Sequence, residues 1–224
     1  DLLGGESAPD LWRSLAFTLR VSGAATILAA AAAIAIVVWL DRPTGTHLHA
    51  GALHVNLAIP HAVWAVALML LLSQSGILSR ASAGLGITGS PTDFPVLVGD
   101  RYGVGLIIHY ATKEAPFLAL LALAIWRAQP QELTRIAASL GAGRWQRARL
   151  LIIPTVAPAV AAASALVLAF IVGAAEAPAI LGASTPRMLS LVSLDLFNSP
   201  DLTRRPTAMA LGMLMSALTL VMVW

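Results

Sequence analysis

The feature that most constrains this chain is a run of twenty residues, Val21 to Leu40, that contains no charged side chain. Crossing the hydrocarbon core of a bilayer takes roughly 20 mostly apolar residues in an α-helix. Four further apolar stretches follow along the chain. Within lipid the backbone polar groups must be satisfied inside the segment, so such runs form helices. The sequence therefore predicts an all-α membrane protein with five transmembrane helices.

We expect the spans at residues 14–40, 55–79, 103–126, 150–175 and 207–224, with a loop at 127–149. Trp12 and Arg20 lie on the helical approach to the first span, near the interface. Pro43, Gly45 and Gly51 predict a non-helical loop before the second span, and Pro60 inside that span is tolerated because neighbouring groups can satisfy the freed carbonyl. Residues 80–101 are predicted to form a surface loop.

The composition agrees with a membrane protein. Of the 224 residues, 58% are hydrophobic and 11% are charged, whereas soluble domains carry about 25% charged residues. The absence of cysteine excludes disulfides and thiolate metal sites. A net charge of +3 without a basic run interleaved with aromatics predicts no nucleic-acid partner. The first residue is not Met and the last, Trp224, lies in an apolar run, so we interpret the chain as a piece of a longer polypeptide.

The stretch from Pro130 to Pro154 differs from the spans around it. Pro130 suits the start of a helix, and Glu132 complements the positive end of the helix dipole. Gly141 and Gly143 predict its end, because glycine readily adopts the left-handed cap conformation. The helix carries an apolar stripe at i, i+3, i+4 and i+7: Leu133, Ile136, Ala137 and Leu140. A short amphipathic helix between two spans predicts an exposed segment that docks on a partner.

Arginines predict the orientation of the chain. The loop between the third and fourth spans is the richest in them, with Arg127, Arg135, Arg144, Arg147 and Arg149. Because basic residues favour the cytoplasmic side, we expect this loop in the cytoplasm. Each span carries the chain to the other side of the membrane. The amino terminus and the two longer loops, residues 80–101 and 176–206, are therefore expected outside, and the carboxyl end inside.

The same stretch resembles the signature loop of permease subunits of ABC importers that work with a binding protein. The family pattern is Glu-Ala-Ala, three residues, Gly, nine residues, Ile, one residue, Leu-Pro. Aligned on Gly141, the downstream positions fall on Leu151 and on Ile153-Pro154, which are conservative changes. Upstream, the family Glu falls on Arg135 and the first Ala on Ile136, whereas Ala137 keeps the second Ala. The spacing is kept and the acid is lost.

Other segments are similar to the same MetI-like superfamily, including YGVGLIIHYATKEAPFLALLALAIWRAQPQEL and AEAPAILGASTPRMLSLVSLDLFNSPDL. Together with PHAVWAVALMLLLSQSGILSR they look most like the thiamine-transport branch. The resemblance implies a multi-pass protein of the bacterial cytoplasmic (inner) membrane. It also implies a small cationic substrate such as thiamine, with polyamine or iron(III) as alternatives.

The resemblance further implies three protein partners in the lipid bilayer. These are a cytoplasmic ABC ATPase dimer, a second permease domain (a second copy, a homologue or a fused half) and an extracytoplasmic substrate-binding protein. The ATPase would be contacted by the signature loop through Leu133, Arg135, Ile136, Ala137, Leu140, Gly141 and Ala142.

The chain offers no site for ATP hydrolysis of its own. A phosphate-binding loop needs Gly-x-x-x-x-Gly-Lys-Ser/Thr, and the only lysine, Lys113, follows Ala111 and Thr112. We therefore expect no enzyme activity and no cofactor, with ATP hydrolysed by a separate subunit.

Four ionisable residues are candidates to line a translocation path: His109, Lys113, Glu114 and Glu176. A charge at bilayer depth is costly and usually faces protein or water. His109 lies one helical turn before Lys113, and Glu114 points about 100° away. Alternatively, Lys113 and Glu114 snorkel out of a span that begins later, and Glu176 caps the segment after the fourth span.

The histidines His47, His49, His54 and His61 cluster in sequence. Metal ligation is one reading. The reading we prefer is that they are interfacial and loop residues, since the His-Glu-x-x-His spacing is missing. We accordingly expect no metal site.

Two other classes of protein compete with a permease. An ion-coupled secondary transporter would favour inverted repeats, and we find no convincing internal repeat. An intramembrane enzyme would need a paired carboxylate or a Gly-x-Ser-x-Gly element, and the sequence has neither at the histidines. An ATPase and an external binding protein as companions would distinguish the permease from both.

Overall fold

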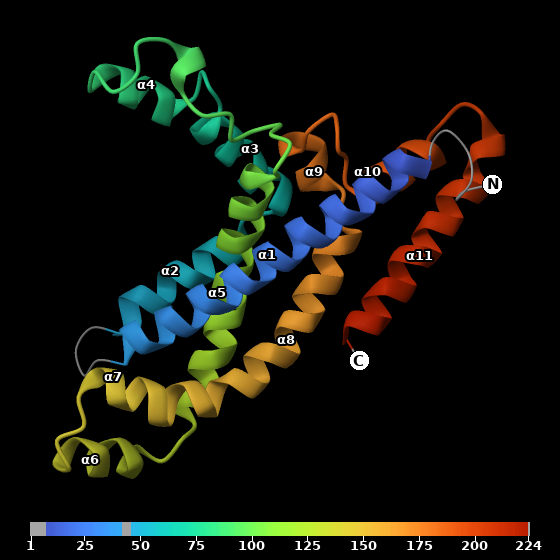
Figure 1. Ribbon diagram of the computed structural model, residues 1–224. Helices are drawn as coiled ribbons and strands as arrows, with labels where there is room; N and C mark the ends of the chain where they lie inside the picture. The colour runs from blue at the N-terminus through green and yellow to red at the C-terminus, as the bar shows by residue number, and fades with distance from the viewer. Residues whose placement is uncertain (1–7, 42–45, 224) are drawn as a thin grey trace. The chain divides into compact units, whose positions relative to one another are not determined.

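The computed structural model describes residues 8–41 and 46–223, and its regular elements in these ranges are all helical (Figure 1). The α-helices are α1 (Ala8–Leu40), α2 (Thr46–Ala58), α3 (His61–Leu72), α4 (Ile77–Gly84), α5 (Val104–Arg127), α6 (Gln131–Ser139), α7 (Arg144–Arg147), α8 (Ile153–Gly173), α9 (Glu176–Leu181), α10 (Leu189–Phe197) and α11 (Arg205–Val223). Short 3₁₀ turns, η1 (Pro91–Asp93) and η3 (Leu202–Arg204), and a π-helical turn, η2 (Ala148–Ile152), complete them.

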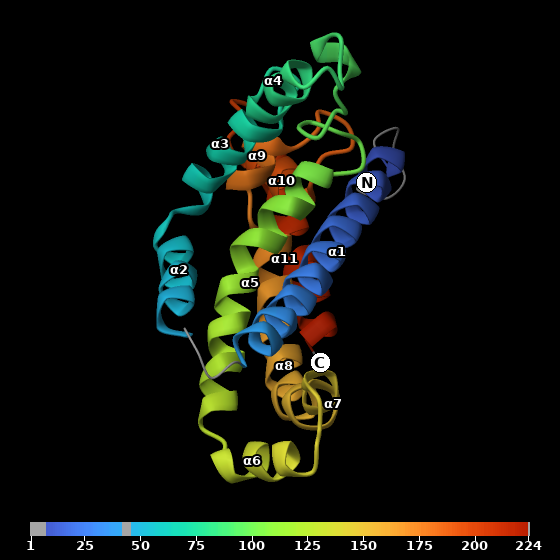
Figure 2. The same cartoon turned by 90° about the vertical axis from the view of Figure 1, so that its left-hand side faces the viewer.

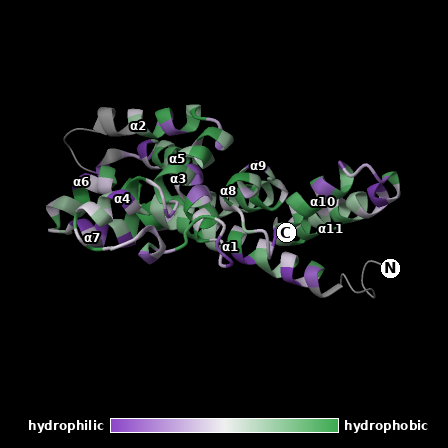
Figure 3. Ribbon diagram, turned by 90° about the horizontal axis from the view of Figure 1, so that it is seen from above, coloured by the Kyte–Doolittle hydropathy of each residue, from purple (hydrophilic) through white to green (hydrophobic). Residues whose placement is uncertain are grey.

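Five helical segments of the described chain are long and apolar enough to cross a membrane, which confirms the predicted fold class. They are Asp10–Leu40, His61–Gly84, Val104–Arg127, Arg144–Gly173 and Leu202–Met222. Green, hydrophobic residues are spread over the helices in Figure 3, with purple, hydrophilic residues between them, and α8 contains no charged residue. The short helix α6 lies between the third and fourth of these segments, as the sequence predicts.

The second span differs from the expected 55–79. The helix breaks between Ala58 and His61, because Pro60 has no N–H to donate and disfavours a helical conformation at Ile59. The expected loop before this span is helical from Thr46 onward, as α2. Gly51 lies inside α2, since one glycine costs a helix only about 1 kcal/mol relative to alanine.

The fourth span also begins earlier than the expected residue 150. Helical structure starts at Arg144 and passes through the π-helical turn η2 before α8. Pro154 cannot donate a backbone hydrogen bond, and helices often change their winding next to proline or at a π-bulge. Thr155 Oγ1 donates to Leu151 O at 2.7 Å, which satisfies a carbonyl in this irregular turn.

The chain forms two compact units. Unit 1 contains residues 8–25, 60–110 and 168–223 of the described chain, and unit 2 contains residues 26–41, 46–59 and 111–167. Helices α1, α5 and α8 each contribute to both units.

The core of unit 2 is built from α1, α5 and α8 with the turn η2. Its buried members are Val37, Leu40, Ala122, Leu123, Ile152, Val156 and Val160. Ala29 and Ala33 continue the buried face of α1 at four-residue spacing. Small residues at this spacing let helix backbones approach closely, which is how helices pack in membranes.

Unit 1 depends on one glycine and several side-chain caps. Gly103 has φ +69°, and a Cβ there would lie 2.6 Å from Val21 Cγ2, so a larger residue fits neither the backbone nor the packing. Asp100 accepts from the backbone N–H of Val104 at 2.8 Å and so caps α5. Thr18 Oγ1 accepts from Leu189 N at 2.9 Å at the start of α10. Helix α10 lies beside α11, and α3 beside α9 (Figures 1 and 2).

We predict that Ala122→Leu destabilises the protein because Ala122 is fully buried in the unit 2 core. Overpacking costs about 1–3 kcal/mol, so the midpoint of thermal unfolding in detergent should fall. The matched control is Ala124→Leu on the same helix, since Ala124 is exposed. Equal unfolding midpoints for the two variants would contradict the packing described here.

Candidate functional site

The predicted docking helix is present as α6, and its end is built as the glycines predict. Gly141 has φ +78°. Its N–H donates to Ala138 O at 3.0 Å, and Ala142 N–H donates to Ala137 O at 2.9 Å. These two bonds form a Schellman motif, which needs a left-handed residue after the helix. Gly141 therefore turns the chain out of α6 without leaving carbonyls unsatisfied.

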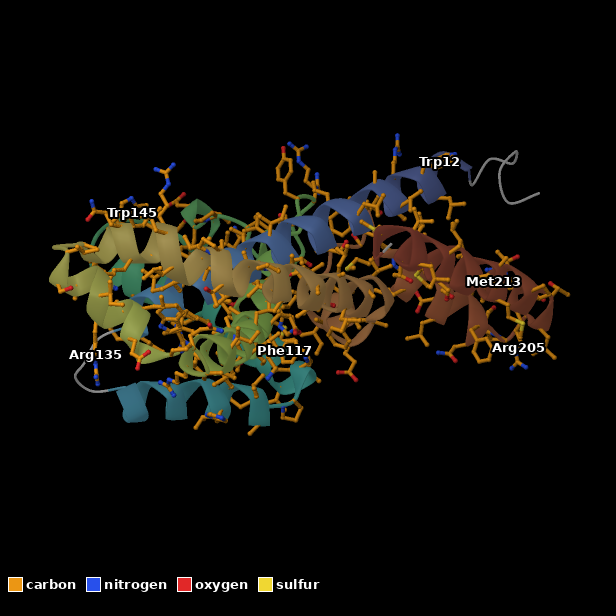
Figure 4. The ribbon with its side chains drawn as sticks, turned by 90° about the horizontal axis from the view of Figure 1, so that it is seen from below. Trp12, Phe117, Arg135, Trp145, Arg205 and Met213 are labelled. Atoms are coloured by element: carbon orange, nitrogen blue, oxygen red, sulfur yellow. The ribbon has the colours of Figure 1, made fainter. Side chains whose placement is uncertain are left out.

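The apolar stripe of α6 is exposed. Leu133, Ile136 and Leu140 keep 52%, 56% and 81% of their surface accessible, and Ala137 and Ala142 are half-buried. Arg135 points away from α6, and Trp145, 74% exposed, points away from α7 (Figure 4). A short helix that leaves its apolar side uncovered has a surface suited to a partner.

The segment after α6 is tied to the ends of α1 and α5 in unit 2. Arg144 donates to Val38 O in the last turn of α1, from Nη2 at 3.0 Å and Nε at 3.3 Å. Asp41 directly follows α1; one of its oxygens accepts from Trp126 Nε1 at 3.1 Å, and the other lies 3.6 Å from Arg147 Nη2. These contacts fix the position of α7 in the unit.

Lys113 has a specific partner. Its side chain is buried, and its Nζ donates to Asn56 O in the last turn of α2. The usual donor to this carbonyl would be the N–H four residues on, and Pro60 has none. The backbone N–H of Ile59 also donates to Asn56 O, at 3.3 Å. A cation at a helix C-terminus is favoured by the helix dipole, so Lys113 acts as a cap for α2.

His109 lies in an aromatic cluster of unit 1. Its side chain is fully buried, and its ring centroid is 4.9 Å from that of Tyr110 and 5.7 Å from that of His61. The ring of His61 in turn lies 5.0 Å from that of Phe170. His61 is the first residue of α3, directly after the break at Pro60. The break thus places a polar, aromatic cluster where α3, α5 and α8 meet.

The two glutamates occupy different environments. Glu114 is buried in unit 2, next to Lys113 in sequence. Glu176 is exposed and is the first residue of α9 in unit 1. An acid in the first turn of a helix is stabilised by the dipole, but α9 begins after Ala175 without a side-chain cap hydrogen bond.

No group of three or more His, Asp or Glu side chains that could hold a metal ion occurs among the described residues. His54 is exposed, and the side chains of His47 and His49 lie outside the described part. A cavity of about 390 Å³ lies in unit 1 between the start of α1, the turn at residues 184–187, α10 and α11. None of the four candidate path residues lines this cavity.

Sequence reasoning missed Asp41, Trp126 and Asn56 as parts of the site. The pattern of residues marks Asp41 only as the acid after a span and Trp126 only as an interfacial aromatic. Their contacts, Lys113 with Asn56, Trp126 with Asp41 and Arg147 with Asp41, join positions 57 to 106 residues apart, so only the tertiary structure could reveal them.

Five spans with an exposed amphipathic helix between the third and fourth define a multi-pass membrane protein, and its class as a permease follows from the family match. The family model described as "Binding-protein-dependent transport system inner membrane component" matches residues 25–224. The chain belongs to this family, the permease subunits of ABC importers, which are transport proteins. It is a multi-pass protein of the bacterial cytoplasmic (inner) membrane, as predicted.

The chain is 30% identical over 203 residues to the inner membrane ABC transporter permease protein YnjC of Escherichia coli (strain K12). The match covers 88% of this chain and 37% of YnjC, so the chain spans little more than a third of that relative.

Two crystal structures of a bacterial ABC transporter for alginate have the same fold. One shows the transporter with a periplasmic protein bound to an alginate pentasaccharide, with TM-score 0.80, 19% identity, and 99% of this chain and 77% of that chain covered. The other describes the import of the acidic polysaccharide alginate, with TM-score 0.81, 20% identity, and 99% and 78% covered.

We predict that Lys113→Met loosens the end of α2. Losing a hydrogen bond to a charged group costs about 1.5–3 kcal/mol, so the amides of residues 53–59 should exchange about tenfold faster or more by mass spectrometry. Lys113→Arg, which keeps a charged donor, is the control and should stay near wild type. Unchanged exchange in Lys113→Met would show that the contact with Asn56 does not hold α2.

Proposed function

We propose that this chain forms half of the translocation path of an ABC importer and is driven by a cytoplasmic ABC ATPase dimer that docks on α6. One observation carries this proposal. Helix α6 lies between two spans, ends in a glycine cap, and exposes Leu133, Ile136 and Leu140. Family membership makes a separate ATPase the expected source of energy.

Docking would use the helix-in-groove mode, in which apolar residues at i, i+3 and i+7 enter a cleft. Leu133, Ile136 and Leu140 have this spacing and are all exposed. Arg135 is exposed and points away from α6 (Figure 4), at the position where the family signature has an acid and on the other side of the helix from this stripe. We infer that Arg135 meets an acidic or carbonyl group of the ATPase. The arginines of residues 127–149 support the cytoplasmic placement of this surface.

The proposed assembly needs further protein domains. Five spans enclose no channel alone, and alternating access requires two halves that move against each other. The second permease domain would be a second copy, a homologue or a fused half of a longer chain. We treat residues 1–224 as one transmembrane domain, since the family match covers parts of both units. An extracytoplasmic binding protein would deliver the substrate.

Among the four path candidates, Glu114 and His109 fit the proposal best. Both side chains are buried on the span α5, and buried ionisable groups in spans mark substrate pathways. The contact of Lys113 with Asn56 favours a structural role for Lys113. The exposed position of Glu176 at the start of α9 suits either an exit of the path or a helix cap.

The substrate proposal stays with a small cation such as thiamine, with polyamine or iron(III) as alternatives. Its support is the resemblance of three segments to the thiamine-transport branch, together with buried Glu114 and the aromatic rings of Tyr110 and Phe170. Aromatic faces attract cations. The name of YnjC indicates no substrate, and the likeness to the alginate transporter is one of fold, so neither bears on thiamine.

We predict that Gly141→Val uncouples ATP hydrolysis from transport while the protein still inserts. A side chain in the left-handed conformation costs about 1–2 kcal/mol, and a β-branched one costs more, so the Schellman cap should open. Substrate transported per ATP should fall about tenfold in reconstituted vesicles.

The matched control is Gly143→Val. Gly143 has an ordinary extended backbone (φ −67°, ψ 168°), and a Cβ there would meet only the end of Gln146, at 3.9 Å. This variant should transport normally. Normal coupling in Gly141→Val, in a complex that assembles with the ATPase, would count heavily against the assignment of α6.

The substrate class is tested with the companion binding protein. Calorimetry against thiamine, spermidine and iron(III) should show tight binding of one of these cations. Binding of an anion such as sulfate or molybdate instead would remove the cation proposal and leave the family assignment untouched.

A further inference from the structure

We propose that Asp41, Trp126 and Arg147 form a clamp that makes the docking segment α6–α7 move together with the ends of α1 and α5. The three side chains, called the Asp41 clamp below, would be positioning residues for coupling. This inference rests on the proposed function, in which force enters the membrane domain at α6.

The clamp joins three elements that are far apart in sequence. Asp41 directly follows α1, Trp126 lies in the last turn of α5, and Arg147 ends α7. The carboxylate of Asp41 contacts the other two at once. One oxygen accepts a hydrogen bond from Trp126 Nε1 at 3.1 Å, and the other forms an ion pair with Arg147 Nη2 at 3.6 Å, which is beyond hydrogen-bond distance. One side chain therefore links the segment after α6 to two spans besides α8.

The side chains of this ion pair are less exposed than those of three other ion pairs in the described chain, Asp10–Arg13, Arg187–Asp195 and Asp201–Arg204. The side chains of Asp41 and Arg147 are 14% and 21% exposed. Those of the pair Asp10–Arg13 are 74% and 69% exposed, and those of Asp201–Arg204 are 51% and 60% exposed. Exposed pairs contribute little to stability, whereas removing one partner of a buried pair leaves an uncompensated charge. The Asp41 clamp should therefore resist separation.

Arg144 adds a second contact on the same side. Its guanidinium donates through two nitrogens to Val38 O in the last turn of α1. The C-terminal carbonyls of a helix lack intrahelical donors and attract cations. Arg144 and Arg147 thus contact the last turn of α1 and the residue after it. Arg144 is exposed, so we expect the less exposed contact of Arg147 with Asp41 to contribute more to holding α7 to this end of α1.

A displacement of α6 can be transmitted to the spans by two routes. One is covalent, through α7 and η2 into α8. The other is the Asp41 clamp, which reaches α1 and α5. Opening the clamp should leave docking of the ATPase intact, because the exposed stripe of α6 is untouched, and should let α6 move without α1. The expected defect is therefore loss of coupling, distinct from loss of assembly.

The first test measures position without any partner. The chain has no cysteine, so Ser139→Cys on α6 and Ala35→Cys on α1, both exposed positions of unit 2, can carry spin labels in the full chain. Pulsed electron resonance should give a narrow distance distribution. Asp41→Asn should broaden it, and the matched control Asp10→Asn, in an exposed pair, should not.

A second set of variants tests the clamp if Asp41→Asn does not fold. Trp126→Phe removes the indole N–H together with part of the ring system, and Arg147→Gln removes the guanidinium charge and shortens the side chain. Either should broaden the distribution, whereas Arg149→Gln, which alters an exposed arginine two residues on, should not. A distribution as narrow as wild type in Trp126→Phe and Arg147→Gln would overturn the clamp.

The second test measures coupling in the reconstituted importer. Substrate transported per ATP should fall about tenfold in Asp41→Asn and Arg147→Gln, within the usual range of coupling free energies, while the ATPase still binds. The exchanged pair Asp41→Arg with Arg147→Asp should recover part of the loss, which a general destabilisation would not allow. Full coupling in both single variants would overturn the proposal.

The two tests separate the clamp from the function on which it rests. If wild type binds no ATPase, the proposed function fails, and the spin-label comparison still decides whether Asp41 holds α6 to α1. If wild type couples normally and Asp41→Asn and Arg147→Gln do too, the clamp fails and the proposed function stands.

Discussion

The need to satisfy backbone groups at helix ends in apolar surroundings governs most of the polar chemistry in this protein. An unpaired N–H or C=O away from water costs several kcal/mol. Pro60 leaves the carbonyl of Asn56 without its usual donor, and Lys113 supplies one. The end of α1 receives Arg144, and the start of α10 is held by Thr18. The breaks that give the chain its short helices thus persist because side chains from other elements complete them.

This constraint changes how the charges and apolar residues should be interpreted. A buried charge in a span suggests a path residue, yet Lys113 is explained by a helix end. The opposite holds on α6, where apolar side chains stay exposed although the helix lies outside the spans. A satisfied charge needs no further partner, whereas Leu133, Ile136 and Leu140 stay exposed. The strongest indication of function is therefore the apolar surface outside the spans.

The two units divide the candidate roles. The docking helix, the Asp41 clamp and the contact of Lys113 with Asn56 all belong to unit 2. The cluster of His109, His61 and Phe170 belongs to unit 1. Because α1, α5 and α8 contribute to both units, a displacement received in unit 2 has three continuous helices along which to reach unit 1. This division agrees with the proposal that coupling and substrate passage are performed by different residues.

The sequence by itself determined the fold class, the number of spans and the short amphipathic helix α6, because span length, apolar period and the glycine cap at Gly141 are local properties of the chain. The docking of α6 on a partner stays a prediction. It did not predict helix α2, since Gly51 was expected to break a helix, nor the break at Pro60, since proline is often accommodated within spans. Only the tertiary structure decided that Lys113 caps α2 and that Asp41 joins Trp126 to Arg147. These pairings depend on which helix ends meet in space, and hydrophobic periodicity carries no information about contacts between residues 57 to 106 positions apart.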